Sequence, residues 1–488
     1  MSPGRALDPA MDVFARLAAQ GAMIERLTAD SRRCAPGTAF FAYPGEKSDG
    51  RSHIADALSR GAAAVVWEAE GFQWRNEWRI PNLAVGGLKQ RASVLAADFH
   101  GRPSEHLWVC GVTGTNGKTS SSQWIAAALG RHGARTGVIG TLGSGFPGAL
   151  REAGNTTPDA LELQAMLQEL RTAGARAVAM EVSSHGLVQG RVSGVRFSCA
   201  LFTNLSHDHL DYHGTMQAYG EAKARLFSMQ GLQTAVLNLD DAFGRELAGR
   251  LAGRVRTIGY SLAPVARGVV DEVLSVNPQM QIESSWGPGE LVTRQVGRFN
   301  VSNVLGVLGA LIAYGVPFAQ ALALIAELPD VPGRMQVVGE RPLVVVDYAH
   351  TPDALEKVLA TLRPIAAERA GQLVIVFGAG GDRDPAKRSL MGAAASRGAD
   401  RVFITSDNPR SEDPAAIIDA VARGASGVPR READRRRAIE AALLEAAPED
   451  VILIAGKGHE SYQEIRGERL PFSDEAVARA ALSQRSGS

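Results

Sequence analysis

Residues 107–119 read Leu-Trp-Val-Cys-Gly-Val-Thr-Gly-Thr-Asn-Gly-Lys-Thr, and this stretch anchors the interpretation of the whole chain. Its apolar start predicts a buried strand, and its glycine and hydroxyl residues predict a tight turn. Residues 120–129 then carry apolar side chains at helical spacing. A strand, a glycine-rich turn ending in Lys-Thr and a helix together form the context of a phosphate-binding loop.

This loop predicts a site for a nucleotide triphosphate. Glycines let backbone N–H groups approach phosphate oxygens, and the N-terminus of the helix adds partial positive charge. Lys118 suits the terminal phosphates, and the Thr119 hydroxyl suits Mg²⁺. The pattern departs from G-x4-G-K-[ST] at one point, because Val112 stands at the first glycine position and Gly111 lies one residue earlier. An ordinary strand-to-helix turn is the alternative, but the flanking strand and helix favour nucleotide binding.

The composition is typical of a soluble enzyme. A chain of 488 residues suggests about three domains, and 52 basic residues balance 52 acidic ones, so no net charge attracts nucleic acid or an anionic membrane. Cys34, Cys110 and Cys199 show no paired spacing, so the sequence indicates neither a disulfide framework nor a thiolate metal site. Residues 1–12 have no apolar signal-peptide core, and the apolar stretch at residues 304–316 is too short to span a bilayer. We therefore expect a cytoplasmic protein.

The order of apolar and polar segments predicts an α/β protein of three domains. Residues 1–105 form a small α/β domain, and residues 106–330 form a central P-loop-type domain with a doubly wound parallel sheet. Residues 331–488 form a C-terminal Rossmann-like α/β domain. Between the last two domains, residues 328–333 read Leu-Pro-Asp-Val-Pro-Gly. Proline and glycine interrupt helices and strands, so this stretch predicts a linker.

The same pattern places individual elements in the first two domains. It predicts a helix at residues 54–60 and strands at residues 38–42, 63–67, 178–182, 200–203 and 235–239. Residues 261–297 lose the helical period and predict an inserted β region. The polar segments 30–32 and 45–50 flank the first strand, and they are either solvated turns or substrate loops.

In the C-terminal domain, four predicted strands each lead into a polar loop. The strands are at residues 343–346, 373–377, 401–405 and 451–454, and the loops are at residues 347–350, 378–384, 406–410 and 456–460. Ligands of open α/β sheets bind beyond the carboxyl ends of the strands, so these loops predict one common site. The arginine-rich residues 430–437 are interpreted as a solvated helix face.

Acidic and histidine residues in the central domain predict a metal site. Glu181 ends an apolar run, where a strand would deliver its carboxylate to Mg²⁺ beside the loop; a surface glutamate is the alternative. Residues 204–213 contain three histidines and two aspartates. Zinc is conceivable there, but no cysteine or downstream histidine pair completes a tetrahedral set. We predict Mg²⁺ with His209 as a ligand, and His207 and His213 as loop residues.

Four motifs occur in the order found in Mur ligases, and the chain resembles that family over essentially its whole length. They are Gly114-Thr115-Asn116-Gly117-Lys118-Thr119, Glu181-Val182-Ser183-Ser184-His185, Asn204-Leu205-Ser206 with Asp208-His209-Leu210-Asp211, and Asp347-Tyr348-Ala349-His350. The resemblance implies an ATP-dependent ligase that adds the third residue of the peptidoglycan stem peptide, in cytoplasmic cell-wall synthesis linked to cell shape and division. It implies UDP-N-acetylmuramoyl-L-Ala-D-Glu and meso-diaminopimelate as substrates, no nucleic-acid or membrane partner, and a monomer.

The resemblance also implies roles for individual residues around the nucleotide. The ATP-binding residues would be Gly114, Thr115, Asn116, Gly117, Lys118, Thr119, Ser120, Asn300, Arg334 and Asp347. The catalytic residues would be Lys118, Glu181, His209 and Lys223, and the Mg²⁺ ligands would be Thr119, Glu181, His209 and Lys223 as its carbamate. From spacing alone, Lys223 would pass as a solvated helix residue.

Two further sets would bind the other substrates. The UDP-N-acetylmuramoyl-dipeptide would contact Ser31, Glu46, Lys47, Ser48, Asn155, Thr156, Thr157, Ser183, Gln189 and Arg191. Diaminopimelate would contact Arg383, Asp407, Asn408, Pro409, Arg410, Gly456 and Glu460. The Arg410 guanidinium suits the distal carboxylate of diaminopimelate, and Glu460 suits its ammonium. Lysine has no distal carboxylate and would leave a buried Arg410 unpaired.

Several alternatives remain open at this point. The nearest are the enzyme that adds L-lysine at the same step and ligases of neighbouring steps. Folylpolyglutamate synthetase shares the central fold, but a domain of about a hundred residues before the phosphate loop is unexpected there. A nucleotide-driven switch or motor ATPase belongs to another class, and it would need neither Lys223 nor a C-terminal amino-acid pocket.

Overall fold

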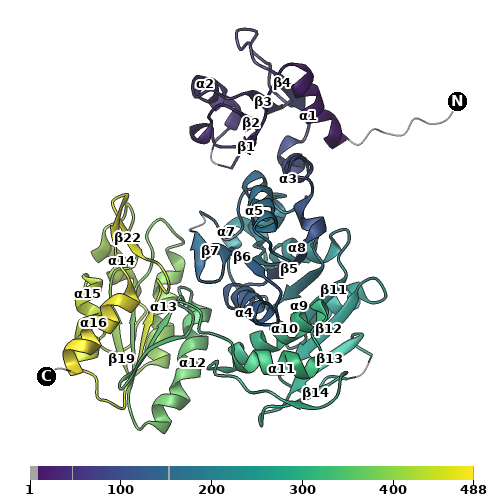
Figure 1. The fold of residues 1–488 in the computed structure, drawn as a ribbon. Coiled ribbons are helices and arrows are strands. Elements are labelled where there is room, and N and C mark those ends of the chain that lie inside the picture. The colour runs from purple at the N-terminus through teal and green to yellow at the C-terminus, as the bar shows by residue number, and fades with distance from the viewer. Residues whose placement is uncertain (1–8, 47, 152–153, 267, 487–488) are drawn as a thin grey trace.

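The computed structural model describes residues 9–46, 48–151, 154–266 and 268–486. Residues 1–8 of the N-terminal stretch and the predicted substrate residue Lys47 lie outside the described part. The chain builds three main sheets in succession, one within each predicted domain, and Figure 1 shows the N-terminal and C-terminal bodies next to the central one. The fold is the expected mixed α/β architecture with parallel sheets.

The N-terminal body is a four-stranded parallel sheet in the order β1-β2-β3-β4. Its elements are α1 Pro9–Ala19, β1 Arg26–Thr28, η1 Ser31–Arg33, β2 Thr38–Ala42, η2 Gly50–His53, α2 Ile54–Ser59, β3 Ala64–Glu68, β4 Asn82–Val85, α3 Leu88–Phe99 and η3 Pro103–His106. All five residues of β2 are buried, because helices cover both faces of a parallel sheet. The helix α3 leads into the central body, where the Ser93 hydroxyl donates to the Arg191 carbonyl (3.0 Å).

The central body contains an 11-stranded sheet in the order β15-β14-β13-β12-β11-β10-β5-β9-β6-β7-β8. Its strands are β5 Trp108–Thr113, β6 Thr136–Gly140, β7 Gly143–Phe146, β8 Ala149–Arg151, β9 Ala177–Glu181, β10 Cys199–Phe202, β11 Thr234–Asn238, β12 Arg256–Ser261, β13 Glu272–Val276, β14 Gln281–Ser284 and β15 Gly289–Glu290. The middle of this sheet is parallel, and the predicted inserted β region appears as β13–β15, which extend one edge.

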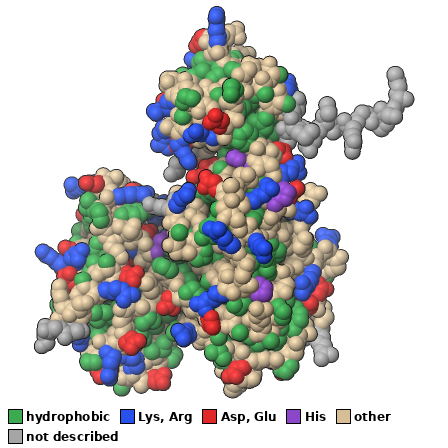
Figure 2. Space-filling view, in the orientation of Figure 1, with side chains coloured by type: hydrophobic (Ala, Val, Ile, Leu, Met, Phe, Trp, Pro, Cys, Tyr) green, Lys and Arg blue, Asp and Glu red, His purple; other side chains and the backbone are tan. Residues whose placement is uncertain are grey.

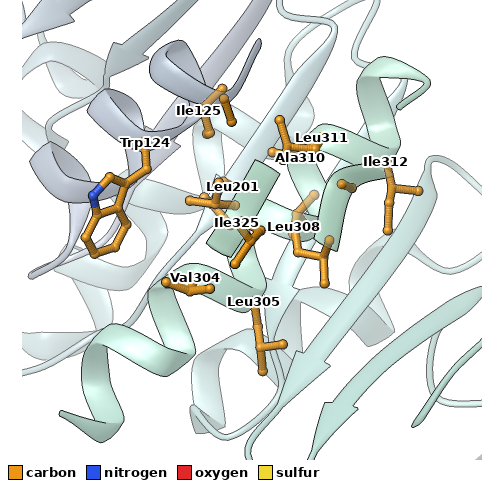
Figure 3. Packing of buried hydrophobic residues seen from close by; sticks show 14 of the residues in the cluster. Trp124, Ile125, Leu201, Val304, Leu305, Leu308, Ala310, Leu311, Ile312 and Ile325 are labelled. Carbon is orange, nitrogen blue, oxygen red and sulfur yellow. The ribbon is translucent and has the colours of Figure 1, made fainter. Parts of the chain in front are cut away.

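Helices cover both faces of the central sheet. They are α4 Lys118–Arg131, α5 Ala160–Thr172, α6 Ser184–Val188, α7 Leu210–His213, α8 Met216–Ala224, η4 Arg225–Ser228, α9 Ala242–Leu251, α10 Arg298–Tyr314 and α11 Phe318–Ala326. Figure 3 shows the core between α4, α10, α11 and the sheet, where Ile125, Leu201 and Leu308 are 0% exposed. Trp124 in this core donates from Nε1 to the Pro329 carbonyl (2.9 Å), which fixes the predicted linker against the phosphate-loop helix.

The C-terminal body is a doubly wound sheet in the order β16-β17-β21-β18-β19-β20, with a separate hairpin of β22 and β23. Its elements are β16 Gln336–Glu340, β17 Leu343–Asp347, α12 Pro352–Glu368, β18 Leu373–Phe377, α13 Ala386–Gly398, β19 Arg401–Ile404, α14 Pro414–Ala422, β20 Arg430–Arg431, α15 Arg435–Leu444, β21 Val451–Ala455, β22 Tyr462–Ile465, β23 Glu468–Pro471 and α16 Asp474–Ser486. Helices α12, α13 and α14 cover one face, and α15 and α16 cover the other.

The interpretation of residues 430–437 as a solvated face was wrong at one residue. Arg435 is fully buried, and its guanidinium pairs with the equally buried Asp474 at 2.7 Å. Helix α15 lies on the sheet, so one residue in each turn faces inward whatever its charge. The other arginines form exposed ion pairs, such as Arg431 with Asp419.

The distribution of charge on the surface agrees with the balanced composition. Basic and acidic side chains are interspersed over the face of all three bodies shown in Figure 2. Among the described residues, no helix combines the length and the apolarity that crossing a bilayer requires.

Candidate active site

The phosphate loop leaves β5 at the centre of the main sheet and needs glycine at two positions. Gly114 and Gly117 have φ values of +149° and +85°. A Cβ at Gly114 would collide with the Thr203 hydroxyl, and one at Gly117 would collide with the Asn303 amide. Both glycines are therefore required by backbone conformation and by close packing.

The end of the neighbouring strand β10 holds the loop in place. The backbone N–H of Thr115 donates to the Asn204 carbonyl (2.8 Å), and the backbone N–H of Asn116 donates to Asn204 Oδ1 (3.0 Å). The Thr203 hydroxyl donates to the Asn116 carbonyl (2.6 Å). The sequence motif at residues 204–206 thus has a structural role that sequence analysis did not assign.

Lys118 begins helix α4 and folds back over the loop. Its Nζ donates to the carbonyls of Gly114 and Thr115, both at 2.8 Å. Burial lowers the pKa of Lys118, and the nearby Glu181 carboxylate opposes that change. The ammonium lies among backbone groups that surround the predicted phosphate position.

Thr119 and Glu181 form a set of oxygen donors beside the loop. The Thr119 hydroxyl donates to Glu181 Oε2 (3.0 Å), and Thr141 donates to Glu181 through its backbone N–H (2.8 Å) and its hydroxyl (3.0 Å). Glu181 is 1% exposed at the end of β9. Among the described residues, no three His, Cys, Asp or Glu side chains are placed to hold a metal together. Mg²⁺ suits a site with few protein ligands, because phosphate and water oxygens complete its octahedral shell.

His209 lies near the loop in a left-handed backbone conformation. Its φ is +53°, and its Nε2 is 3.4 Å from Asp208 Oδ2. Burial lowers the pKa of His209 to about 4, so the imidazole is neutral at physiological pH, which is the form that binds metal ions. His213 is more than a loop residue, since its Nε2 hydrogen-bonds to Ser184 Oγ (2.9 Å).

Lys223 is buried, contrary to what its spacing alone suggested. It lies on α8 with 1% exposure, and its Nζ donates to the Gly114 carbonyl (2.8 Å) and lies 4.2 Å from the centre of the Tyr219 ring. Burial, helped by the charge of Lys118, holds the pKa of Lys223 well below its usual value. The structure therefore places an amine with reduced basicity directly under the phosphate loop.

The predicted dipeptide residues meet at the junction of the first two bodies. Glu46 Oε1 accepts hydrogen bonds from Tyr212 Oη (2.9 Å) and from Gln189 Nε2. Arg191 donates from Nε to Gln189 Oε1 (2.8 Å) and from Nη1 to the Thr157 carbonyl (2.7 Å). This network spans the boundary between the N-terminal and central bodies.

The other described residues of this set make separate contacts. The Thr157 hydroxyl donates to Ser183 Oγ (3.1 Å), and Thr156 Oγ1 hydrogen-bonds to Thr141 Oγ1 (3.0 Å). Ser48 Oγ hydrogen-bonds to His53 Nε2 (2.9 Å). Ser31 is buried in η1, and Asn155 is exposed.

The C-terminal body contributes Arg334 to the phosphate loop. Its Nη2 donates to the Thr119 hydroxyl (3.2 Å), and its guanidinium lies 4.3 Å from the centre of the Tyr348 ring. Asp347 accepts the backbone N–H groups of Met335 (2.8 Å) and Ala349 (2.7 Å). Burial raises the pKa of Asp347. Asp347 thus fixes the turn that carries Arg334.

Two other predicted nucleotide residues are buried near the loop. Ser120 lies in the first turn of α4 and is 5% exposed. The Asn300 amide donates to the Val296 carbonyl (2.9 Å) in its own segment. The nearby Asn303 packs on Gly117 and so contacts the phosphate loop itself, whereas Asn300 was predicted to bind the nucleotide. Asn303 occupies the next inward position of α10, a periodicity that the sequence does show.

The predicted amino-acid loops converge at the carboxyl ends of β18, β19 and β21. Arg410 has φ +51°, donates from Nη1 to the Gly381 carbonyl (2.6 Å), and lies 3.6 Å from Glu464 Oε2. Asn408 Nδ2 donates to Glu460 Oε2 (2.8 Å). Glu464, from the hairpin, is a charged member of this cluster that sequence analysis missed.

Gly456 and Gly381 allow the loops of this cluster to pack closely against Asp407 and Pro409. A Cβ at Gly456 would lie 2.6 Å from Asp407 Oδ2, and a Cβ at Gly381 would collide with the Pro409 carbonyl. The loops after β18 and β19 therefore pack backbone to backbone, and the loop after β21 packs against the Asp407 side chain. Arg383 is exposed at the edge of these loops, where a Cβ at Gly380 would lie 3.8 Å from its Cγ and 3.0 Å from Arg410 Nη1.

Three family models match this chain. They are the Mur ligase family, catalytic domain, over residues 23–100, the Mur ligase middle domain over residues 112–311, and the Mur ligase, glutamate ligase domain over residues 333–458.

Individual proteins match over almost the whole length. The UDP-N-acetylmuramoyl-L-alanyl-D-glutamate–2,6-diaminopimelate ligase of Chromobacterium violaceum is 51% identical over 473 residues, which cover 95% of each chain. The ligase with the same name from Pseudomonas aeruginosa is 51% identical over 468 residues, or 94% of this chain and 95% of the relative. A solved structure of a ligase with this name is 37% identical, covers 95% of each chain and gives a TM-score of 0.66.

Proposed function

Because this chain belongs to the Mur ligase family, we propose that it adds meso-2,6-diaminopimelate to UDP-N-acetylmuramoyl-L-alanyl-D-glutamate with cleavage of ATP to ADP and phosphate. One observation carries the proposal: relatives named for this activity are about half identical over 95% of the chain. We also propose that the protein works in the cytoplasm in peptidoglycan synthesis, and as a monomer.

The chemistry requires activation of the γ-carboxylate of the D-Glu residue. A carboxylate does not acylate an amine at neutral pH, so its oxygen first attacks the γ-phosphorus of ATP and releases ADP. The amine of diaminopimelate then attacks the carbonyl carbon of the acyl phosphate, loses a proton and expels phosphate. Phosphoryl transfer depends mainly on positioning and on neutralisation of charge.

The residues around the phosphate loop suit these tasks. Lys118 and the loop N–H groups would hold the phosphates of ATP, and Arg334 would add a second cation from the C-terminal body. Thr119 and Glu181 would bind Mg²⁺, with His209 as a further ligand. The ion, when bound, neutralises charge on the phosphate oxygens.

The proposal is tested by measuring what the reaction consumes and produces. Purified protein, ATP and Mg²⁺ are incubated with the UDP-linked dipeptide and with diaminopimelate, lysine or neither, and ADP release and product mass are measured. ADP release that requires both substrates supports the ligase. Release that is indifferent to them would favour a switch ATPase, and faster use of lysine would favour the lysine-adding enzyme.

Replacing Arg410 by alanine is expected to raise the KM for diaminopimelate by about a hundredfold or more. The guanidinium lies against the loop after β18, through its hydrogen bond to the Gly381 carbonyl, and would bind the distal carboxylate in two places. The KM for ATP should barely change. Steady-state kinetics with each substrate varied in turn provide the measurement.

A surface arginine of the same body provides the control for this variant. Arg423 follows α14 and is exposed, so Arg423→Ala should leave both KM values unchanged. If Arg410→Ala raised the KM for ATP and the KM for diaminopimelate equally, the diaminopimelate pocket would lie elsewhere.

Lys223 is expected to react with CO₂ to form a carbamate. This reaction needs an unprotonated amine, and burial favours that form because it lowers the pKa of Lys223 well below its usual value. The carbamate would offer an anionic oxygen where an ammonium would repel Mg²⁺. NMR with isotopically labelled CO₂ should show one protein carbamate, and the Lys223→Arg variant should lack it. A labelled signal that persists in this variant would place the carbamate on another amine.

A further inference from the structure

Lys457 is a fully buried lysine beside the residues that we propose for the distal end of diaminopimelate. It lies in the loop after β21, and its side chain is 0% exposed. Its Nζ donates to Glu460 Oε2 (2.9 Å) and to Asn408 Oδ1 (3.0 Å). Asn408 Nδ2 donates to the same oxygen of Glu460 (2.8 Å). The three side chains therefore form a closed ring of hydrogen bonds between two loops.

This ring fixes the orientation of both partners of Lys457. An ammonium can only donate, so Asn408 must turn its carbonyl oxygen toward Lys457. The same oxygen also accepts the backbone N–H of Glu464 (2.9 Å). The Asn408 NH₂ group is thereby directed at Glu460 Oε2, which receives two hydrogen bonds, whereas the described residues supply none to Oε1. The Glu460 side chain is 19% exposed, so Oε1 is the oxygen left for a ligand.

The charge of Lys457 also weakens the attraction of the Glu460 carboxylate for a cationic ligand. A carboxylate already paired with a buried cation attracts a second cation less strongly than a bare carboxylate does. A ligand that brings only an ammonium would therefore gain little at Glu460. A ligand that brings a carboxylate as well would gain the Arg410 guanidinium in addition.

We propose that Lys457 is a positioning residue that makes this pocket select a zwitterionic end group over a bare ammonium. The inference rests on the proposed function, because it concerns the substrate of that same site. Lys457 acts through Glu460 and Asn408 and does not itself bind the substrate. The pocket then discriminates by the balance of its charges, and Arg410 alone does not account for its selectivity.

The test compares diaminopimelate with lysine in the variant Lys457→Met, which keeps the length of the side chain and removes its charge. The KM for diaminopimelate should rise about tenfold, since Glu460 and Asn408 lose their fixed orientation, and the KM for ATP should not change. The ratio of kcat/KM for diaminopimelate to that for lysine should fall about tenfold, because Glu460 becomes a bare anion.

Two further variants separate charge from position. Lys457→Gln keeps N–H donors without the charge, so it should lower the discrimination against lysine with a smaller rise in the KM for diaminopimelate. The double variant Lys457→Met/Glu460→Gln should lose any increase in kcat/KM for lysine that Lys457→Met shows. Lys357→Met, which removes an exposed lysine from α12 of the same body, should behave as the wild type.

The outcomes distinguish this inference from the proposed function. Wild-type protein that makes no product with diaminopimelate would refute the proposed function. A folded Lys457→Met or Lys457→Gln protein with unchanged discrimination would overturn only the role of Lys457. A lower melting temperature with equal loss of kcat/KM for both amino acids would show a merely structural lysine, and would also overturn it.

Discussion

Replacement of Lys118 by methionine is expected to lower kcat by about a thousandfold or more. Lys118 Nζ lies within 2.8 Å of the carbonyls of Gly114 and Thr115, so the ammonium sits inside the loop that would surround the phosphates. Negative charge develops on the phosphate oxygens during transfer, and a fixed cation in a buried site stabilises it strongly. Single-turnover ADP formation with saturating substrates measures the effect on chemistry directly.

The opposite end of the same helix provides a matched control. Arg131 ends α4, is about half exposed and pairs with Glu327, so Arg131→Met removes a cation without approaching the loop. Its kcat should stay close to that of the wild type. A Lys118→Met protein that keeps its rate to within about tenfold would mean that the nucleotide phosphates bind elsewhere.

The sequence predicts the central strands well because they are buried on both faces. Parallel strands of this kind are continuous apolar runs, and Leu373–Phe377 occupies the predicted range to the residue. The strand expected at residues 178–182 is found one residue earlier, at Ala177–Glu181. The short edge strands β15 and β20 have two residues each, which is too few to show any period.

The sequence was less informative about which polar side chains are buried. Lys223 and Arg435 both lie in helices rich in polar residues, and nothing local distinguishes them from solvated neighbours. Their burial follows from the tertiary packing of α8 under the phosphate loop and of α15 on the C-terminal sheet. Propensity and pattern do not contain that information.

The sequence also could not show which distant segments contact each other. Tyr212 and Glu46 are 166 residues apart, and their hydrogen bond depends on how two domains pack. The motifs of the site could nevertheless be recognised, because each follows a strand whose carboxyl end lies at the same edge of a sheet. Sequence reasoning thus found the loops, while the pairing of Lys457 with Glu460 within them needed coordinates.

Replacement of Asp474 by alanine is expected to destabilise the C-terminal body by about 3–5 kcal/mol. Asp474 and Arg435 are both 0% exposed and form a bidentate ion pair, so the alanine leaves an uncompensated buried cation. Arg435 also donates to the carbonyls of Ser406 (3.3 Å) and Ala455 (2.8 Å). A fall of roughly 10 °C in the melting temperature of this body, measured by calorimetry, corresponds to such a loss.

The loss of this ion pair should also disturb the proposed amino-acid site, because Arg435 holds the ends of two strands whose loops form that site. Ser406 follows β19 and Ala455 ends β21, and β18 lies between these two strands, so Arg435 ties together two loops that are not neighbours in the sheet. Asp419→Ala, which removes an exposed carboxylate paired with Arg431, should cost less than about 1 kcal/mol. A double variant, Arg435→Met/Asp474→Leu, should recover part of the stability, because two apolar side chains leave no buried charge. If Asp474→Ala were no less stable than Asp419→Ala, the strand ends would be held by backbone packing alone.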